Sequence, residues 1–251
     1  MSESAALKTL ERFAEKQAST HEVMRALVTH DDYFVPIGFA PAIARHEYER
    51  IVMLSQKGVP PKGELYVFTD ERCLDLVSEQ PLGSFVTPVT GVELFCAMPT
   101  DGSVAKLKVN PGGTLKHFWF VGDDALPLTR LWGRAIRLEK LLAEPERSKE
   151  GLHAALRTFE GFTILVNEKD AVTTAQGAGG FQNPALVFTS PDSFERVLGQ
   201  FPQLRPVTMS GPELFELLPR AGVDGIAFNV MGPGATAYFP LSLGAQVLQL
   251  S

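Results

Sequence analysis

Hydrophobic residues in this chain form short continuous runs, separated by stretches in which they recur at helical spacing. Two of these runs, LYVF at 65–68 and TILV at 163–166, show no alternation of apolar and polar positions. Strands that are buried on both faces have this pattern, and helices between the strands cover those faces. The pattern therefore predicts an α/β fold with a mixed sheet covered by helices.

The same order of elements is predicted twice: helix, strand, strand, helix, strand, helix, strand. In the first part, helices are expected near 20–30, 70–80 and 91–98, and strands near 33–38, 64–69, 84–89 and 104–110. In the second part, helices are expected near 148–158, 191–199 and 211–218, and strands near 162–167, 185–189, 204–208 and 225–230.

Sequence identity supports this repetition. The string VFT at 67–69 recurs at 187–189, and TGVELF at 90–95 recurs as SGPELF at 210–215. Without a gap, residues 67–99 match residues 187–219 at 10 of 33 positions. Ordinary composition would supply about two identities. The sequence therefore predicts an internal duplication, in which two diverged copies of one unit follow each other.

Upstream of these segments the similarity continues at a spacing of 129 residues. YFVPI at 33–37 parallels FTILV at 162–166, so the first copy carries nine additional residues before its next strand. They fall within residues 42–56, where a charged helix is expected. The predicted parts are an N-terminal helix (1–19), a first unit (20–120), a connecting helix (121–147) and a second unit (148–251).

The helices at the start and middle of the chain have apolar stripes. Leu7, Leu10 and Phe13 form such a stripe near the N-terminus, which we expect to dock on the protein itself; a groove on a partner would require the same stripe. The connecting helix follows an expected strand, LKHFWFV at 115–121, and places Leu131, Ala135, Leu138 and Leu142 on one face.

The ordered motifs resemble those of a known family. LYVFTDE at 65–71, a short helix, a strand, TGVELF at 90–95 and VNPGG at 109–113 resemble the N-terminal domain of the SseB family. The second copy is similar, but Val230 and Met231 interrupt its Asn-Pro-Gly turn. The resemblance covers about residues 20–113 and 150–240. It implies a bacterial protein with an α/β fold, no recognised active site and no agreed activity.

Charge and composition narrow the range of partners. The chain has 23 basic and 29 acidic residues among 251, a formal net charge of -6, and its basic residues are scattered. We therefore expect no nucleic-acid partner. Nothing approaches 18 uninterrupted apolar residues, and the first residues lack the apolar core of a signal peptide, so no membrane association is expected. Cys73 and Cys96 stand in apolar surroundings, which favours buried free thiols and a cytoplasmic protein.

Two recurring glutamates are interpreted as helix caps. Thr90 with Glu93, and Ser210 with Glu213, have the spacing of capping boxes, in which hydroxyl and carboxylate each bond a backbone N–H at the start of a helix. Ser190-Pro191 and Asp70 are interpreted as further helix starts.

No catalytic constellation, metal site or cofactor is predicted. The five histidines include no pair spaced four residues apart on one helix. Thiol catalysis would require Cys73 or Cys96 to meet a base such as His117, and this alternative stays open. The glycines at 177–180 are expected in a loop between strands. The segment Asn110–Gly113 is expected to form a turn, and a shared binding loop is the alternative.

Function is predicted from the resemblance together with this absence of catalytic motifs. We expect a non-catalytic protein-binding or adaptor protein, of which an immunity-type protein is one specific form. The alternative is a small-molecule-binding protein or enzyme that uses the cleft between the copies.

Recognition is predicted mainly in the first copy, because interfaces favour Tyr, Trp and Arg. The predicted binding residues are Arg45, Tyr48, Arg50, Asn110, Gly112, Gly113 and Trp119. The competing interpretation is that the aromatic residues are core and the inserted helix covers a sheet edge.

Overall fold

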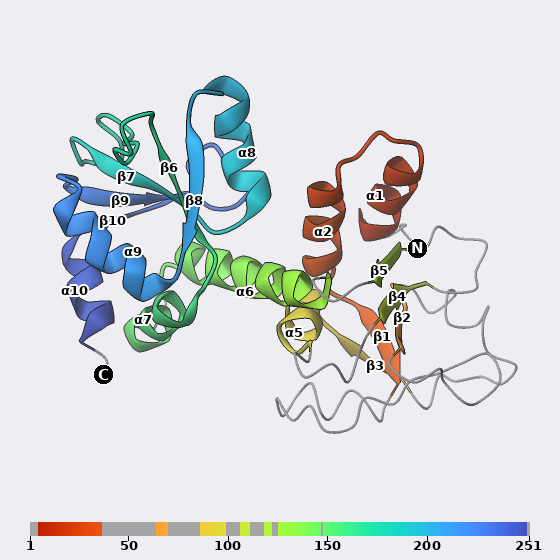
Figure 1. The fold of residues 1–251 in the computed structure, drawn as a ribbon. Coiled ribbons are helices and arrows are strands. Elements are labelled where there is room, and N and C mark those ends of the chain that lie inside the picture. Colours follow the sequence, from red (N-terminus) through yellow and green to blue (C-terminus); the bar gives the residue numbers. More distant parts are fainter. Residues whose placement is uncertain are drawn as a thin grey trace, which may run out of the picture. The chain divides into compact units, whose positions relative to one another are not determined.

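The chain forms two compact units, Met1–Arg134 and Ala135–Ser251. The computed structural model describes residues 5–36, 64–69, 86–98, 106–110, 118–121, 125–146 and 148–249 (Figure 1). The division falls inside helix α6 (Ala125–Ala143), within the segment predicted as a connecting helix. The predicted helices near 42–56 and 70–80 lie outside the described residues.

The second unit contains a mixed five-stranded sheet. Its strands are β6 (Phe162–Val166), β7 (Pro184–Phe188), β8 (Arg205–Met209), β9 (Gly225–Phe228) and β10 (Ala237–Pro240). They lie in the order β10-β9-β7-β6-β8, in which only β7 and β9 are parallel neighbours. Every residue of β6, β7 and β9 is buried, whereas β8 is largely exposed and carries Pro206. Proline is tolerated there because an edge strand has free N–H positions.

Helices cover both faces of this sheet, as the apolar runs predicted. The helices are α7 (Lys149–Thr158), α8 (Pro191–Gln200), α9 (Gly211–Leu217) and α10 (Ser242–Leu248), with a short 3-10 turn at Leu218–Arg220. Val197 of α8 packs in one cluster with Ala227, whereas the next residue, Phe228, stacks against Phe162, which also meets Phe215 of α9. Successive strand residues point to opposite faces, so α8 and α9 lie on opposite sides.

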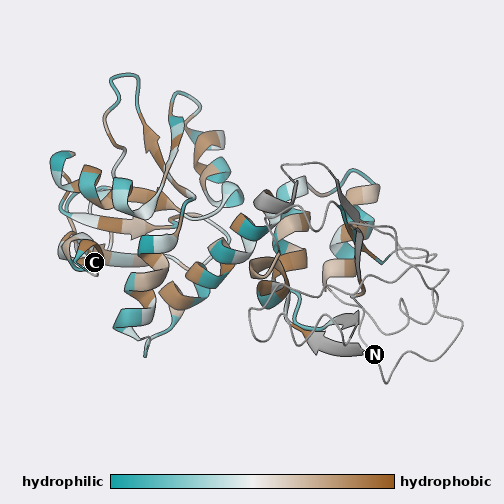
Figure 2. Cartoon of the chain, turned by 60° about the horizontal axis from the view of Figure 1, so that its bottom comes forward, coloured by the Kyte–Doolittle hydropathy of each residue, from teal (hydrophilic) through white to brown (hydrophobic). Residues whose placement is uncertain are grey.

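The first unit is smaller in its described part. It contains helices α1 (Ala5–Ala14), α2 (Thr20–Val28) and α5 (Gly91–Cys96). Its strands are β1 (Tyr33–Pro36), β2 (Glu64–Val67), β3 (Val86–Val89), β4 (Lys106–Val109) and β5 (Phe118–Val121). Strand β1 pairs antiparallel with β3, β2 pairs parallel with β4, and β4 pairs antiparallel with β5. The helices carry hydrophilic and hydrophobic residues together, as amphipathic helices do (Figure 2).

Strand pairings agree between the two units residue by residue. Tyr33 faces Val89 as Phe162 faces Met209, at the sequence offsets of 129 and 120 found above. In the parallel pairs, Val67 faces Val109 as Val187 faces Phe228. In the last pairs, Val109 faces Phe118 as Phe228 faces Ala237. The agreement is in register as well as in order; the duplication itself stays a prediction.

The predicted α/β fold is confirmed, and two elements were missed. Strand β10 and helix α10 follow the last strand predicted in the second copy. The strand has four residues, of which Phe239 alone is buried. Within the described residues, no helix has the length and apolar character needed to cross a membrane.

Candidate functional site

The predicted binding residues fall into two groups. Five of them, Arg45, Tyr48, Arg50, Gly112 and Gly113, lie outside the described residues. Trp119 lies on β5 opposite Lys108, and Asn110 directly follows β4. The recognition surface expected on the first copy therefore stays a prediction, and of its residues Asn110 has the best-defined contacts.

Asn110 clamps the end of β4 to the end of β2. Its Oδ1 accepts a hydrogen bond from the backbone N–H of Thr69 at 2.9 Å, and its Nδ2 donates to the Thr69 hydroxyl at 2.9 Å. Both side chains are buried, and the φ angle of Asn110 is 53°. Asparagine tolerates this left-handed conformation better than most residues, which explains why the turn begins with it.

Asn229 forms the same clamp in the second unit. Its Oδ1 accepts from the backbone N–H of Thr189 at 2.9 Å, its Nδ2 donates to the Thr189 hydroxyl at 3.0 Å, and its φ angle is 52°. The contacts and φ angle of Asn229 are thus those of Asn110, although Val230 and Met231 follow Asn229 in the sequence where Pro111 and Gly112 follow Asn110. Each clamp joins the carboxyl ends of two parallel strands, and its side chain is committed to the interior of its unit.

In the second unit, a buried carboxylate extends this clamp. Glu139 of α6 is 5% exposed, and its Oε1 accepts hydrogen bonds from the hydroxyls of Thr189 at 3.0 Å and Ser190 at 2.9 Å. Ser190 also lies 2.9 Å from the hydroxyl of Ser193. Since Ser190 gives its one proton to the carboxylate, Ser193 is the donor in that last bond.

Ser190 differs from its predicted role. Helix α8 begins with Pro191, as expected, but the Ser190 side chain forms no capping bond to that helix. Its hydroxyl donates to the Glu139 carboxylate at 2.9 Å. The other predicted start, Asp70, lies outside the described residues.

Both glutamate caps are confirmed. The hydroxyl of Thr90 accepts from the N–H of Glu93, whose carboxylate accepts from the N–H of Thr90 at 3.0 Å. Ser210 and Glu213 repeat this arrangement, with the return bond at 2.8 Å. The hydrogen bond from the Ser210 backbone lowers the pKa of Glu213 below its usual value. These carboxylates serve the helix starts.

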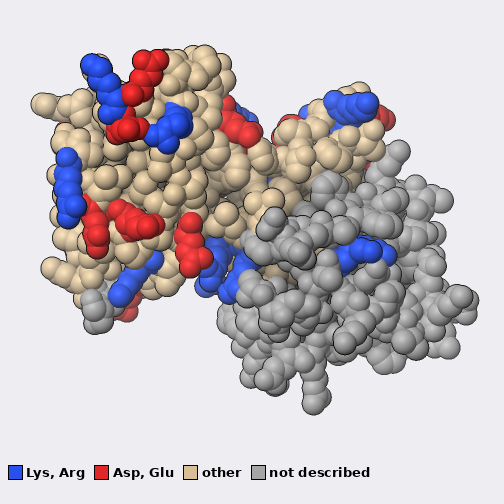
Figure 3. Space-filling view, viewed as in Figure 1, with Lys and Arg blue, Asp and Glu red and all other residues tan. Residues whose placement is uncertain are grey.

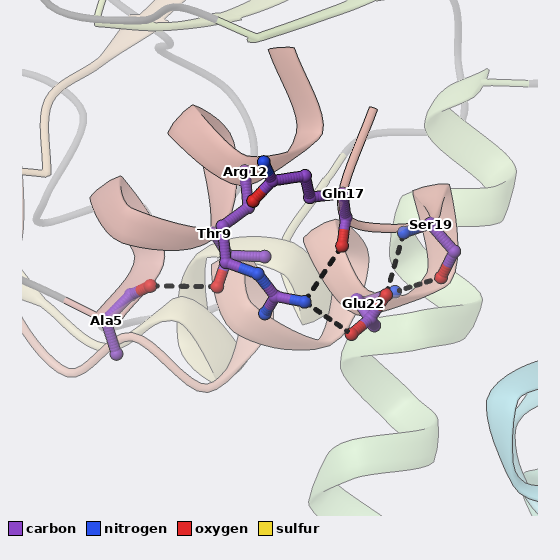
Figure 4. Close-up of polar contacts among 6 residues, drawn as sticks. All are labelled: Ala5, Thr9, Arg12, Gln17, Ser19 and Glu22. Carbon is purple, nitrogen blue, oxygen red and sulfur yellow. Dashed lines mark hydrogen bonds and ion pairs between the residues drawn. The ribbon is translucent and has the colours of Figure 1, made fainter. Parts of the chain in front are cut away.

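A surface clasp ties α1 to α2 in the first unit (Figure 4). The Arg12 guanidinium donates to the carbonyl of Gln17 at 2.9 Å and lies 3.4 Å from the carboxylate of Glu22. Glu22 also completes a capping box with Ser19. The Ser19 backbone N–H, more than Arg12, lowers the pKa of Glu22. Arg12, Gln17, Ser19 and Glu22 are all exposed to solvent, so these contacts link only the surfaces of α1 and α2.

Turn residues after β9 expose an apolar side chain. Met231 is 47% exposed and has a φ angle of 63°, which is rare for a residue with a long side chain. The turn is held from within by the Gly232 N–H bond to the carbonyl of Asn229, at 3.0 Å, and by Val230, which packs against the α8 cluster. Phe201 and Tyr238 of the same unit are also exposed.

Acidic and basic side chains are interspersed on the face of the second unit that Figure 3 shows. Among the described residues, no group of three or more His, Cys, Asp or Glu could hold a metal ion. Cys96 lies at the end of α5 and is partly buried, whereas Cys73 and His117 lie outside the described residues. Thiol catalysis through that pair stays an open alternative.

Sequence reasoning missed Glu139 and Met231, although each left a signal. Glu139 stands four residues after Ala135 and three before Leu142, inside the apolar stripe of its helix. A charge at such a position indicates a buried polar contact. Met231 stands two residues after the turn asparagine, where the glycine of the first copy is absent.

The chain matches no family model, no curated protein and no solved structure.

Proposed function

We propose that the chain is a non-catalytic protein-binding or adaptor protein of the SseB-like type, built from two tandem copies of one α/β unit. An immunity-type protein is one specific form of this proposal, and the cytoplasmic location expected from the two cysteines belongs to it. The family part of the proposal rests on the motif resemblance.

The observation that carries the proposal is Met231. Holding a methionine at positive φ costs about 1–2 kcal/mol relative to the usual backbone conformation. Strain of this kind tends to persist at functional sites, and methionine adapts well to apolar binding surfaces. The turn exposes this side chain although burial would be favourable, which supports a role in contact with another protein.

The two turns that follow the asparagine clamps are the proposed recognition elements. Asn110 and Asn229 fix the starts of these turns from inside each unit. The predicted residues Gly112 and Gly113 belong to the first turn, and Met231 belongs to the second. In both turns the clamp asparagine supports the surface without facing a partner.

Affinity capture from source cells tests the proposal. Tagged wild-type chain, Met231→Gly and Lys16→Gly would each be used as bait, with bound proteins quantified by mass spectrometry. Lys16 is the matched control, because it is also a non-glycine residue at positive φ, 60°, in an exposed turn.

We expect one stoichiometric protein partner with the wild type and with Lys16→Gly, and at least about ten-fold less of it with Met231→Gly, or about 1.4 kcal/mol. Glycine relieves backbone strain, so neither variant should lose stability. Equal capture by all three chains would remove Met231 from the proposal. A copurifying metabolite without a protein partner would favour the small-molecule alternative.

A further inference from the structure

In the second unit, the connections that leave the neighbouring parallel strands β7 and β9 run in opposite directions. From β7 the chain turns into α8 and on to β8, past β6, whereas from β9 it turns the other way, to β10. The connections that leave the parallel pair β7 and β9 therefore run in opposite directions. In open α/β sheets, ligands bind outside the carboxyl ends of strands at such a switch point.

Glu139 occupies this position. Its Oε1 accepts from Thr189 and Ser190, which directly follow β7. Its Oε2 lies against the backbone of Gly234, in the loop after β9, so closely that a Cβ there would overlap the carboxylate. The carboxylate thus contacts the segments that leave both parallel strands, and it is almost completely removed from solvent.

Hydroxyl groups surround the Glu139 carboxylate. Ser190 stands at the N-cap of α8, forms no side-chain bond to that helix and donates its hydroxyl proton to Glu139. Ser193, wholly buried, lies beside the Ser190 hydroxyl. A buried carboxylate is stable only when hydrogen-bond donors of this kind surround it.

The scaffold does not require a carboxylate here. Helix α1 ends at Ala14 and α6 at Ala143, an offset of 129, which also relates the starts of α2 and α7 at Thr20 and Lys149. At this offset Glu139 corresponds to Leu10, a buried residue of the first unit. The clamp between Thr69 and Asn110 forms there without a glutamate at that position.

From this geometry we propose that the position outside the carboxyl ends of β7 and β9 is a carboxylate-binding site, which the second unit fills with its own Glu139. Glu139 acts as a built-in ligand. A free carboxylate takes the same place, between Thr189, Ser190 and Gly234, when the Glu139 side chain is shortened. While Glu139 is present, the site is closed to carboxylates from solution.

Chemical rescue with acetate tests this assignment. Glu139→Ala removes a CH2–COO⁻ group, which acetate matches in size and charge. Thermal unfolding of the wild type and of Glu139→Ala would be followed by circular dichroism in sodium acetate and in sodium chloride, at equal pH and ionic strength. Leu10→Ala is the matched control, because it shortens the corresponding buried side chain of the first unit.

We expect acetate to raise the Tm of Glu139→Ala above its value in chloride, by about 4 °C at ten times the acetate Kd. The wild type and Leu10→Ala should give the same Tm in both salts, within about 1 °C. If Glu139→Ala does not fold in chloride, acetate should restore its folded signal. The proposal is overturned if acetate neither raises that Tm nor restores folding, or if Leu10→Ala gains as much.

Discussion

The two units share their strand registers and differ in what holds the first helix of each. In the first unit, Leu10 of α1 is buried, and Arg12 fastens α1 to α2 at the surface. In the second unit, Glu139 stands at the corresponding place in α6 and bonds the ends of the sheet from inside. At the predicted offset of 129, a buried hydrocarbon side chain in the first unit therefore corresponds to a buried carboxylate in the second.

This difference separates what the fold requires from what has diverged. Pairing of β2 with β4, and of β7 with β9, recurs in register, and an asparagine at positive φ closes each pair. Some helix contacts recur as well: the Gly91 N–H donates to the carbonyl of His30 as the Gly211 N–H donates to the carbonyl of Phe159. The strand pairs, the clamps and this helix contact are therefore shared by the two units, whereas the polar contacts of α1 and α6 differ.

Exchanging the two interior residues should have the largest effect. Leu10→Glu places a carboxylate among apolar side chains, and we expect it to destabilise the first unit by about 4 kcal/mol or more. Glu139→Leu keeps the volume filled but removes the acceptor of two hydroxyls, and should cost about 2 kcal/mol. Urea denaturation gives both free energies of unfolding. A smaller loss for Leu10→Glu than for Glu139→Leu would break the comparison.

Removal of either clamp should have a similar, intermediate effect. Asn110→Ala and Asn229→Ala leave a buried threonine N–H without its acceptor and force alanine to positive φ, which together cost about 3 kcal/mol. Glycine at the same positions avoids the backbone strain and should cost less. Denaturant midpoints of the four variants sharpen the comparison, since a large loss in one unit alone would show that the clamps are not equivalent.

The surface caps should have the smallest effect, with a defined pH dependence. Glu22 and Glu213 have lowered pKa values, because backbone N–H groups bond their charged forms. Their contribution is therefore present above the unfolded-state pKa and is lost as the pH falls through the lower folded-state pKa. Denaturation midpoints of wild type and Glu213→Gln should differ at pH 7 and converge as the pH falls below the lowered folded-state pKa of Glu213. A constant difference over that range would remove the capping explanation.

Local signals in the sequence predicted most of this fold, and long-range polar contacts escaped them. Capping boxes and the strand-to-helix order depend on residues a few positions apart, so Thr90–Glu93 and Ser210–Glu213 were interpretable. The hydrogen bond that Glu139 accepts from Thr189 spans 50 residues, and it depends on how α6 packs against the sheet. Asn229 was recognised as part of a turn, but its partner Thr189 lies 40 residues away.

Amide hydrogen exchange at Thr69 and Thr189 tests the common scaffold most directly. Both N–H groups are buried and donate to the Oδ1 of the clamp asparagine of their own unit. The account predicts that both exchange slowly, and that Asn110→Ala exposes only Thr69 while Asn229→Ala exposes only Thr189. Rapid exchange at either threonine in the wild-type chain would contradict the claim that each unit has an asparagine clamp of the same kind between its parallel strands.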